Sequence, residues 1–219
     1  MAIKLKPLIL AGGRSTRMGS PKHLLQFPDG TPLYQHQINL LRQAFPSVTT
    51  IYISLAKDSP LDTWLRNAKD LNVEIIYDTQ PNHDEAQSAG PAQGLLSAHE
   101  FDPAATWLVL AVDYPLLTVD LLQQLQDSYQ PPVTCFRNGE GYCEPLLGIW
   151  SPEALRLLQD NVQQGRSSGP SAVVRQLGGH QIDPVTQSDM VLMNVNAQAD
   201  WDKVLQELSG LKANSGRSR

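Results

Sequence analysis

Residues 10–22 read LAGGRSTRMGSPK and continue the apolar stretch PLILA of residues 7–11. Glycines let the backbone approach a ligand closely and adopt positive φ angles at little steric cost. Successive backbone N–H groups in such a loop form a concave anion-binding site, and Arg14, Arg17 and Lys22 add full positive charges. A buried strand that ends in this loop predicts an anionic ligand, of which a nucleoside triphosphate is the simplest.

The two commonest phosphate-binding loops do not fit this stretch. A P-loop requires a lysine directly after its last glycine, whereas Gly19 is followed by Ser20. The dinucleotide fingerprint G-x-G-x-x-G is also absent. The stretch instead matches L-A-G-G-x-S-x-R-M-G-x-x-K and resembles the signature loop of nucleotidyltransferases, above all that of the molybdenum cofactor guanylyltransferases. The alternative is an ordinary β–α turn with solvated cations, but five or more specified positions rarely coincide by chance.

Length and composition indicate one packed domain. The chain has 219 residues, which suits one α/β domain better than two. We expect this domain over residues 1–208 and a disordered polar tail over residues 209–219. Hydrophobic residues make up 41% of the chain and charged residues 18%, a balance typical of a chain with a packed core. The net charge of −5 argues against binding to nucleic acid or to a membrane surface.

The cysteine content bears on the compartment. Cys135 and Cys143 are the two cysteines, which favours a reducing environment and no disulfide framework. No apolar stretch approaches the roughly 20 residues that a membrane span needs, and the first six residues are too polar for a secretion signal. We therefore expect a cytoplasmic protein.

Apolar, strand-like runs alternate with segments of helical period, which predicts an α/β fold with a mostly parallel sheet. Strands are expected at 7–11, 48–54, 73–77 and 107–112, the last of them continuous and apolar and therefore central. A hairpin-like pair is expected at 133–136 and 142–150, a last strand at 190–193 and a last helix at 199–208.

Ligands of open α/β sheets bind beyond the carboxyl ends of the strands. The residues that follow the expected strands should therefore converge on one edge of the sheet. They are the glycine-rich loop, Ser54, Asp78, Asp113, Asn194 and Asn196.

Asp113 is the most informative single residue of this set. It ends a very apolar strand, where an unpaired carboxylate would be costly. A Mg²⁺ ion would explain it, because Mg²⁺ takes one or two carboxylates together with substrate phosphates and water. The alternative is that Asp113 caps the helix that follows, since aspartate is a common N-cap. With the glycine-rich loop in the same chain, we favour the metal.

The other candidates each have a plainer alternative. Asp78 could accept hydrogen bonds from a purine base or simply cap a loop, and Ser54 could be an ordinary strand-end residue. The segment that begins at Gly90 could press on the nucleotide or be a bare turn. Arg17 could hold phosphate or pair with an internal carboxylate. Asn194 and Asn196 could orient phosphate, metal-bound water or acceptor, and capping the final helix would account equally well for Asn196.

Further segments extend the resemblance over nearly the whole chain. They are the GPAQGL of residues 90–95, the VDYP of 112–115, the EPL of 144–146 and the NVN of 194–196. The resemblance implies a three-layer α/β/α nucleotidyltransferase fold with a mostly parallel, mixed central sheet. It also implies a reaction in which GMP passes from GTP to the phosphate of molybdopterin and pyrophosphate is released.

The same resemblance assigns roles to individual residues. Lys22 would lie on phosphate, Asp78 near guanine and Mg²⁺ on Asp113. Catalysis would rest on Lys22, Arg17 and Asp113. The residues implied in nucleotide binding are Leu10, Ala11, Gly12, Gly13, Arg14, Lys22, Ser54, Asp78, Gly90 and Asp113. The partners implied are GTP and molybdopterin as substrates, with molybdopterin-insertion proteins and apo-molybdoenzymes downstream.

Two departures and two alternatives accompany this hypothesis. The loop between Asp78 and Gly90 is longer than usual, and Ala197 stands where the family motif often has threonine. The first alternative is a related enzyme that transfers CMP or another nucleotide to a different phosphorylated acceptor. Gly12 favours GTP, because the related cytidylyltransferases tend to carry Leu-Ala-Ala-Gly there. The second alternative is a non-catalytic nucleotide or cofactor carrier, which would often lack Asp113 or Lys22.

Overall fold

The structure is a computed structural model that describes residues 4–12, 22–57, 59–67, 72–78, 92–186, 188 and 190–215. The strands within these residues are β1 (Leu5–Leu10), β2 (Ile51–Leu55), β3 (Val73–Tyr77), β4 (Thr106–Ala111), β5 (Val133–Arg137), β6 (Cys143–Trp150) and β7 (His180–Ile182). The helices are η1 (Lys22–Leu24, a 3₁₀ turn), α1 (Leu33–Ala44), α2 (Pro60–Asn67), α3 (Ala92–Phe101), α4 (Val119–Asp127), α5 (Pro152–Gln163), α6 (Pro170–Gln176) and α7 (Gln198–Ser215).

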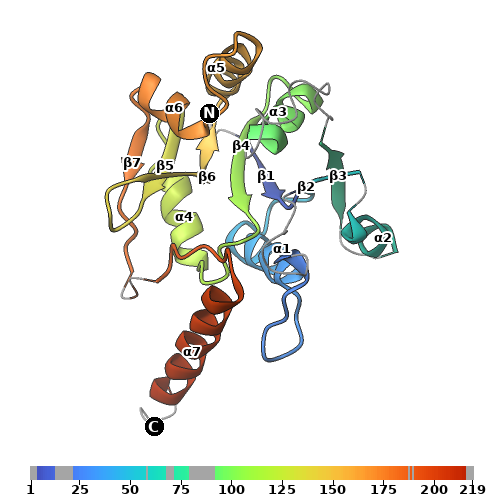
Figure 1. Cartoon of the computed structure of the whole chain (residues 1–219), viewed down its shortest axis with the longest axis vertical. Coiled ribbons are helices and arrows are strands. Elements are labelled where there is room, and N and C mark those ends of the chain that lie inside the picture. Colours follow the sequence, from blue (N-terminus) through green and yellow to red (C-terminus); the bar gives the residue numbers. More distant parts are fainter. Residues whose placement is uncertain are drawn as a thin grey trace.

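The strands form one sheet in the order β3-β2-β1-β4-β6-β5-β7, which confirms the predicted mixed, mostly parallel sheet (Figure 1). β1 pairs in parallel with β2 and β4, and β2 pairs in parallel with β3. β6 runs antiparallel to both of its neighbours, β4 and β5. The carboxyl ends of β1 to β5 therefore share one edge of the sheet with the amino end of β6, and we call this the carboxyl edge.

Both faces of the sheet are covered by helices, because its central strands are apolar on both sides. On β4, Leu108 and Leu110 belong to one buried cluster, whereas Trp107 and Val109 belong to another. The first cluster includes side chains of α1, α2, α4 and α7, and the second includes side chains of α3, α5 and α6. The structure thus has the predicted three α/β/α layers.

The end of the chain differs from the prediction. Residues 190–193 form a turn, in which the Met193 N–H donates to the Met190 carbonyl at 2.8 Å, and not a strand. The apolar side chains of this region pack in the core instead, since Val191 and Val195 are buried in the same hydrophobic cluster as Leu108 and Leu110. The last strand is β7, which pairs in parallel with β5 and has the short sequence HQI.

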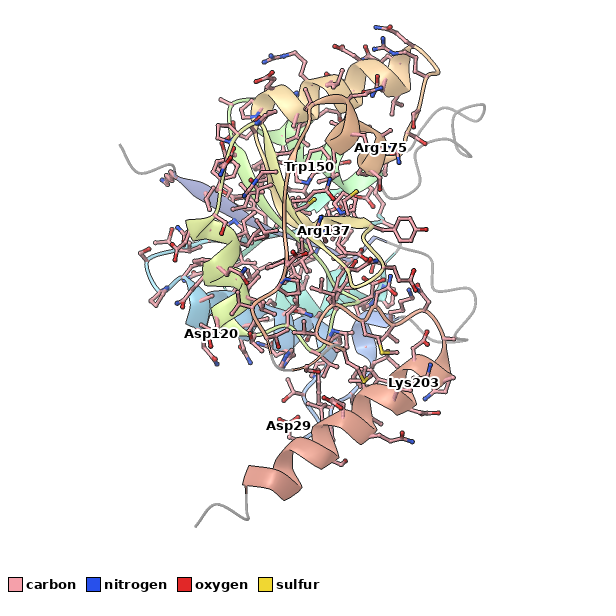
Figure 2. The ribbon with its side chains drawn as sticks, turned by 90° about the vertical axis from the view of Figure 1, so that its left-hand side faces the viewer. Asp29, Asp120, Arg137, Trp150, Arg175 and Lys203 are labelled. Atoms are coloured by element: carbon pink, nitrogen blue, oxygen red, sulfur yellow. The ribbon has the colours of Figure 1, made fainter. Side chains whose placement is uncertain are left out.

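The predicted polar tail begins within a helix. α7 continues to Ser215 and extends away from the sheet in both views of the molecule (Figures 1 and 2). Residues 216–219 lie outside the described residues. No helix in the described part of the chain is both long and apolar enough to span a membrane.

Candidate active site

Two groups of polar residues gather at the carboxyl edge, and each joins segments that are distant in sequence. Gly12 follows β1, Asp78 follows β3 and Ser54 is the next-to-last residue of β2, and we call these three residues the Asp78 cluster. Lys22, Asp113 and Asn196 form the second group, which we call the Lys22 cluster. Because β1 lies between β2 and β4 in the sheet, the two clusters occupy neighbouring positions along the edge.

The segments that form the Asp78 cluster lie very close to one another. The Asp78 N–H donates to the Leu55 carbonyl at 2.8 Å, which extends the pairing of β2 and β3 by one residue. The Ser54 hydroxyl donates to Asp78 Oδ1. A Cβ atom on Gly12 would lie 2.0 Å from Asp78 Oδ2, so only glycine fits here without displacing the carboxylate. Gly94 on α3 leaves room in the same way, since a Cβ there would lie 2.6 Å from Ser54 Oγ.

The environment of Asp78 favours a hydrogen-bond donor as ligand. Burial raises the pKa of the Asp78 carboxyl above its usual value, and the hydrogen bond from Ser54 opposes this shift. A carboxylate that has lost part of its hydration gains from any N–H group that a ligand presents to it. Ser54 is almost completely buried, at 1% exposure, so its hydroxyl serves to hold Asp78.

The Lys22 cluster places one ammonium group between two oxygen ligands. Lys22 lies in η1 and its Nζ is 3.3 Å from Asp113 Oδ2 and 2.7 Å from Asn196 Oδ1. Asn196 in turn donates from Nδ2 to Asn194 Oδ1 at 3.1 Å. Asp113 and Asn196 are 91 and 174 positions away from Lys22 in the sequence. The structure therefore brings four of the predicted site residues into one chain of contacts.

The two capping alternatives do not describe this structure. Thr118 caps α4 by accepting from the Leu121 N–H, so Asp113 does not have that role. The carboxylate of Asp200 accepts from the N–H groups of Asn196 and Ala197, at 3.0 and 2.9 Å, where α7 begins. Asp200 in the first turn of α7 thus accepts from N–H groups that have no acceptor within the helix, which is the role of the acidic residue in a capping box. The Asn196 side-chain oxygen is thereby left for Lys22.

The backbone around Asp113 is held by its neighbours. The Val195 N–H donates to the Asp113 carbonyl at 2.9 Å, and the Val112 N–H donates to the Leu10 carbonyl at 3.0 Å. The Ala11 N–H donates to the Ser54 carbonyl at 3.0 Å. Leu10 and Ala11 thus fix the start of the glycine-rich loop between β2 and β4. Gly13, Arg14, Arg17 and Gly90, which were also predicted at the site, lie outside the described residues.

Tyr114, which follows Asp113, was not predicted as a site residue. It is buried, and its hydroxyl donates to Glu144 Oε2 at 2.6 Å. Burial, together with the negative charge of Glu144, raises the pKa of the Tyr114 phenol well above its usual range, so the hydroxyl stays protonated and donates. The only sequence feature that pointed to this pair was the EPL segment, which contains Glu144. A tyrosine and a glutamate 30 residues apart form no local pattern from which their contact could be predicted.

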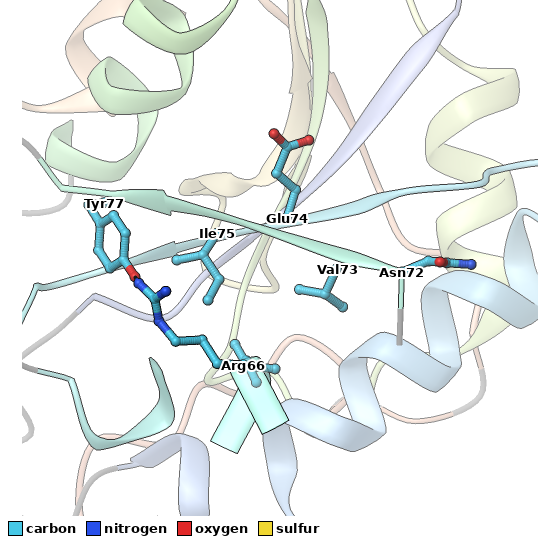
Figure 3. Close-up of a pocket in the computed structure, with 7 residues that line it drawn as sticks. Arg66, Asn72, Val73, Glu74, Ile75 and Tyr77 are labelled. Atoms are coloured by element: carbon cyan, nitrogen blue, oxygen red, sulfur yellow. Dashed lines mark hydrogen bonds between the residues drawn. The ribbon is translucent and has the colours of Figure 1, made fainter. Parts of the chain in front are cut away.

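A pocket elsewhere does not coincide with this site. It lies between α2 and the edge strand β3, and Figure 3 shows the residues that line it, with the Arg66 guanidinium directed at the Tyr77 hydroxyl. Tyr77 also donates to Asp62 at 2.7 Å, so the polar groups at its rim are paired with one another. None of the residues of the Asp78 or Lys22 cluster lines it.

Acid should destabilise the protein through His23, which directly follows Lys22. This side chain is 4% exposed, and burial lowers its pKa from 6.5 to about 4. Between these pH values the unfolded chain binds a proton that the folded chain does not, so the free energy of unfolding falls as the pH drops through this window. The loss should reach about 3 kcal/mol near its lower end.

Urea unfolding between pH 7 and pH 4.5 measures this effect. The His23→Gln variant should lose less stability over the window than the parent protein. Part of the pH dependence should remain, because burial also lowers the pKa of His36 and of His99. Equal losses in the variant and the parent protein would contradict the role given to His23.

The α/β fold is one that solved nucleotidyltransferases share. Solved structures with this fold include a nucleotidyl transferase from Methanothermobacter thermautotroptrophicus, with a TM-score of 0.70 and 15% identity over 93% of this chain and 96% of that one. They also include the CTP:phosphocholine cytidylyltransferase of Streptococcus pneumoniae, with a TM-score of 0.61 and 15% identity over 94% of this chain and 100% of that one. At this identity the likeness concerns the fold alone.

The family is given by the sequence. Residues 7–185 match the model of the MobA-like NTP transferase domain, and the chain belongs to that family. A probable molybdenum cofactor guanylyltransferase of Rhodopirellula baltica is 30% identical over 88% of each chain. The molybdenum cofactor guanylyltransferase of Cupriavidus necator is 28% identical over 86% of this chain and 90% of its own. A molybdenum cofactor biosynthesis bifunctional protein of Synechocystis is 27% identical, and this chain spans 52% of its length.

Proposed function

We propose that this protein transfers GMP from GTP to the terminal phosphate of molybdopterin, yielding a guanine dinucleotide form of the cofactor and pyrophosphate. The observation that carries the proposal is the Lys22 cluster, in which a cation from the end of the glycine-rich loop meets Asp113 and Asn196. Membership in the MobA-like NTP transferase domain family and the names of the relatives support the same reaction.

The Asp78 cluster supports guanine as the base. An ionised carboxylate is purely an acceptor, with two oxygens. Guanine presents two adjacent donors on its Watson–Crick edge, the N1–H and the N2 amino group, whereas cytosine presents a single donor group there. Asp78 Oδ2 lies beside Gly12, 2.0 Å from the position that a Cβ atom would take there. A base held at this position would meet a carboxylate that favours guanine.

Mg²⁺ is the metal that we propose for the site, and the residues present fit it. Asp113 and Asn196 supply hard oxygen atoms, and both already face one cation, the Lys22 ammonium. Among the residues that the structure describes, no group of three or more His, Cys, Asp or Glu side chains could hold a metal. Phosphate oxygens and water would complete the coordination, which is usual for Mg²⁺. When bound, Mg²⁺ would neutralise charge on the phosphates.

The remaining chemistry falls to side chains of this chain. A bond forms between an oxygen of the molybdopterin phosphate and the α-phosphorus of GTP, and the bond from that phosphorus to the bridging oxygen of pyrophosphate breaks. The attacking oxygen is already anionic, so no strong general base is needed. Lys22 would hold phosphate oxygens, and Arg17 and the loop N–H groups would bind the leaving pyrophosphate. Catalysis would consist of positioning and charge stabilisation.

We place this reaction in the cytoplasm, with molybdopterin-insertion proteins or apo-molybdoenzymes as recipients of the product. The thiols of Cys135 and Cys143 are both free in the structure, in keeping with a reducing compartment.

The experiment is a nucleotide screen with purified protein. Pyrophosphate release is measured with GTP, CTP, ATP and UTP, each with and without molybdopterin and Mg²⁺. We expect release only with GTP, molybdopterin and Mg²⁺ together. Release with CTP alone among the nucleotides would favour a cytidylyltransferase. Tight GTP binding without turnover on any acceptor would favour a nucleotide carrier.

A further inference from the structure

Glu144 lies at the carboxyl edge although it stands near the beginning of its strand. β6 runs antiparallel to β4, and Leu147 pairs with Leu110. The start of β6 therefore lies beside the end of β4, where Asp113 and Tyr114 follow. Figure 2 views the molecule from the β7 side and labels Arg137, the last residue of β5, whose partner on β6 is Cys143.

Both oxygens of Glu144 accept hydrogen bonds from different segments. Oε2 accepts from the Tyr114 hydroxyl at 2.6 Å, and Oε1 accepts from Asn138 Nδ2 at 2.8 Å. The Asn138 side-chain oxygen in turn accepts from the N–H groups of Glu140 and Tyr142, at 3.1 and 3.0 Å. Glu144 thus joins the turn between β5 and β6 to Tyr114. The turn itself reaches solvent, since Tyr142 is 67% exposed.

Tyr114 is fixed at two points besides this contact. Its carbonyl accepts from Gln37 Nε2 at 2.7 Å, and the Gln37 side chain is fully buried on α1. The carbonyl of the preceding residue, Asp113, accepts from the Val195 N–H at 2.9 Å. The backbone of this dipeptide is therefore held from α1 and from the segment before α7. Glu144 holds its side chain, because a change of the Tyr114 χ1 rotamer would break that hydrogen bond.

We propose that Glu144 is a positioning residue that acts through Tyr114 to set the orientation of the Asp113 carboxylate. The inference rests on the proposed function, because Asp113 is the residue through which it would affect turnover. It goes beyond that function because it predicts that the Lys22 cluster can be impaired while the Asp78 cluster keeps its function. The hydrogen bonds of Glu144 lead to Tyr114, the residue that follows Asp113, and not to Gly12, Ser54 or Asp78. Glu144 should therefore affect turnover and Mg²⁺ use while leaving the binding of the base unchanged.

The test uses Tyr114→Phe, Glu144→Gln and the double variant. Tyr114→Phe removes only the hydroxyl. Glu144→Gln keeps the size of the side chain but offers one acceptor oxygen to two donors, so either the Tyr114 hydroxyl or the Asn138 amide loses its acceptor. Each single variant should lower kcat by about tenfold with the KM for GTP within twofold of the parent value. The double variant should be no worse than the poorer single variant, because the two residues act in series.

A binding measurement separates this inference from the proposed function. GTP affinity is measured by calorimetry with and without Mg²⁺. The gain in affinity that Mg²⁺ brings should shrink in both single variants, whereas the affinity without Mg²⁺ should not change. If the parent protein fails to turn over molybdopterin and GTP, the proposed function fails, and this measurement still tests Glu144.

Tyr129→Phe is the matched control, because it removes a partly buried phenol hydroxyl that lies beside Thr106, the first residue of β4, at the opposite edge of the sheet. It should leave kcat and the Mg²⁺ effect unchanged. The inference is overturned if the folded Tyr114→Phe variant matches the parent protein in kcat and Mg²⁺ effect, if the effects of the two substitutions add, or if the KM for GTP rises as steeply as kcat falls. If the Glu144→Gln variant does not fold, the kcat and the Mg²⁺ effect of the Tyr114→Phe variant alone decide whether the inference holds.

Discussion

Replacing Asp113 with asparagine should lower turnover by at least about 10²–10³-fold at saturating GTP, molybdopterin and Mg²⁺. The substitution removes the carboxylate of the Lys22 cluster while keeping its shape. Lys22 would keep its contact of 2.7 Å with Asn196 but lose the charge that faces it at 3.3 Å. This ion pair is partly exposed and contributes no more than about 1 kcal/mol, so the fold should survive. Steady-state kinetics and urea unfolding measure the two effects.

Asp183→Asn is the control for this prediction. Asp183 also lies at the carboxyl edge, after β7, but its side chain is 68% exposed and pairs with Arg137 at 2.7 Å, outside both clusters. This variant should turn over at the parent rate. An Asp113→Asn protein that keeps its turnover at saturating Mg²⁺ would remove Asp113 from the mechanism and with it the central argument for the proposed function.

Replacing Gly12 with alanine should raise the KM for GTP by about ten- to a hundredfold. The new Cβ would lie 2.0 Å from Asp78 Oδ2, and the Asp78 side chain is short and already accepts from Ser54. The carboxylate must therefore swing away, which breaks the Ser54 hydrogen bond and leaves the donors of guanine without their acceptor. Because CTP would depend less on this carboxylate, the preference for GTP over CTP should fall.

The measurement is kcat/KM for GTP and for CTP in the same preparation. Gly210→Ala is the control, since a Cβ there meets nothing within 4 Å and the position lies on α7 away from both clusters. It should leave both kinetic constants unchanged and stabilise the helix by roughly 0.5–1 kcal/mol. An unchanged KM for GTP in Gly12→Ala would show that Asp78 does not contact the base.

Much of the fold could be predicted because its strongest signals are local. The continuous apolar run of β4 indicated a buried central strand, and all of its residues from Trp107 to Leu110 are fully buried. β7 was missed because its sequence, HQI, has no apolar alternation. The segment at 190–193 was mistaken for a strand because Val191 is apolar, although that side chain packs in the core from a turn.

The candidate site was predictable as a set of residues but not as a set of partners. Asp113 and Asp78 stand out because each carboxylate ends an apolar strand. Local sequence cannot say that Lys22 meets Asn196, or that Asp200 and not Asn196 serves the N–H groups where α7 begins. Nor can it say that Tyr114 donates to Glu144. Such partners are chosen by which segments the sheet brings to one edge.

The chain's own sequence determined the glycine-rich loop, the alternation of strands and helices and the residue types offered at each strand end. These features depend on steric freedom and on hydrophobic period over a few residues, which neighbours along the chain specify. Only the tertiary structure decided that the oxygens of Asp113 and Asn196 share the Lys22 ammonium, and that a carboxylate lies against Gly12. Those choices depend on the order of strands in the sheet, which is set by packing between segments far apart in the chain.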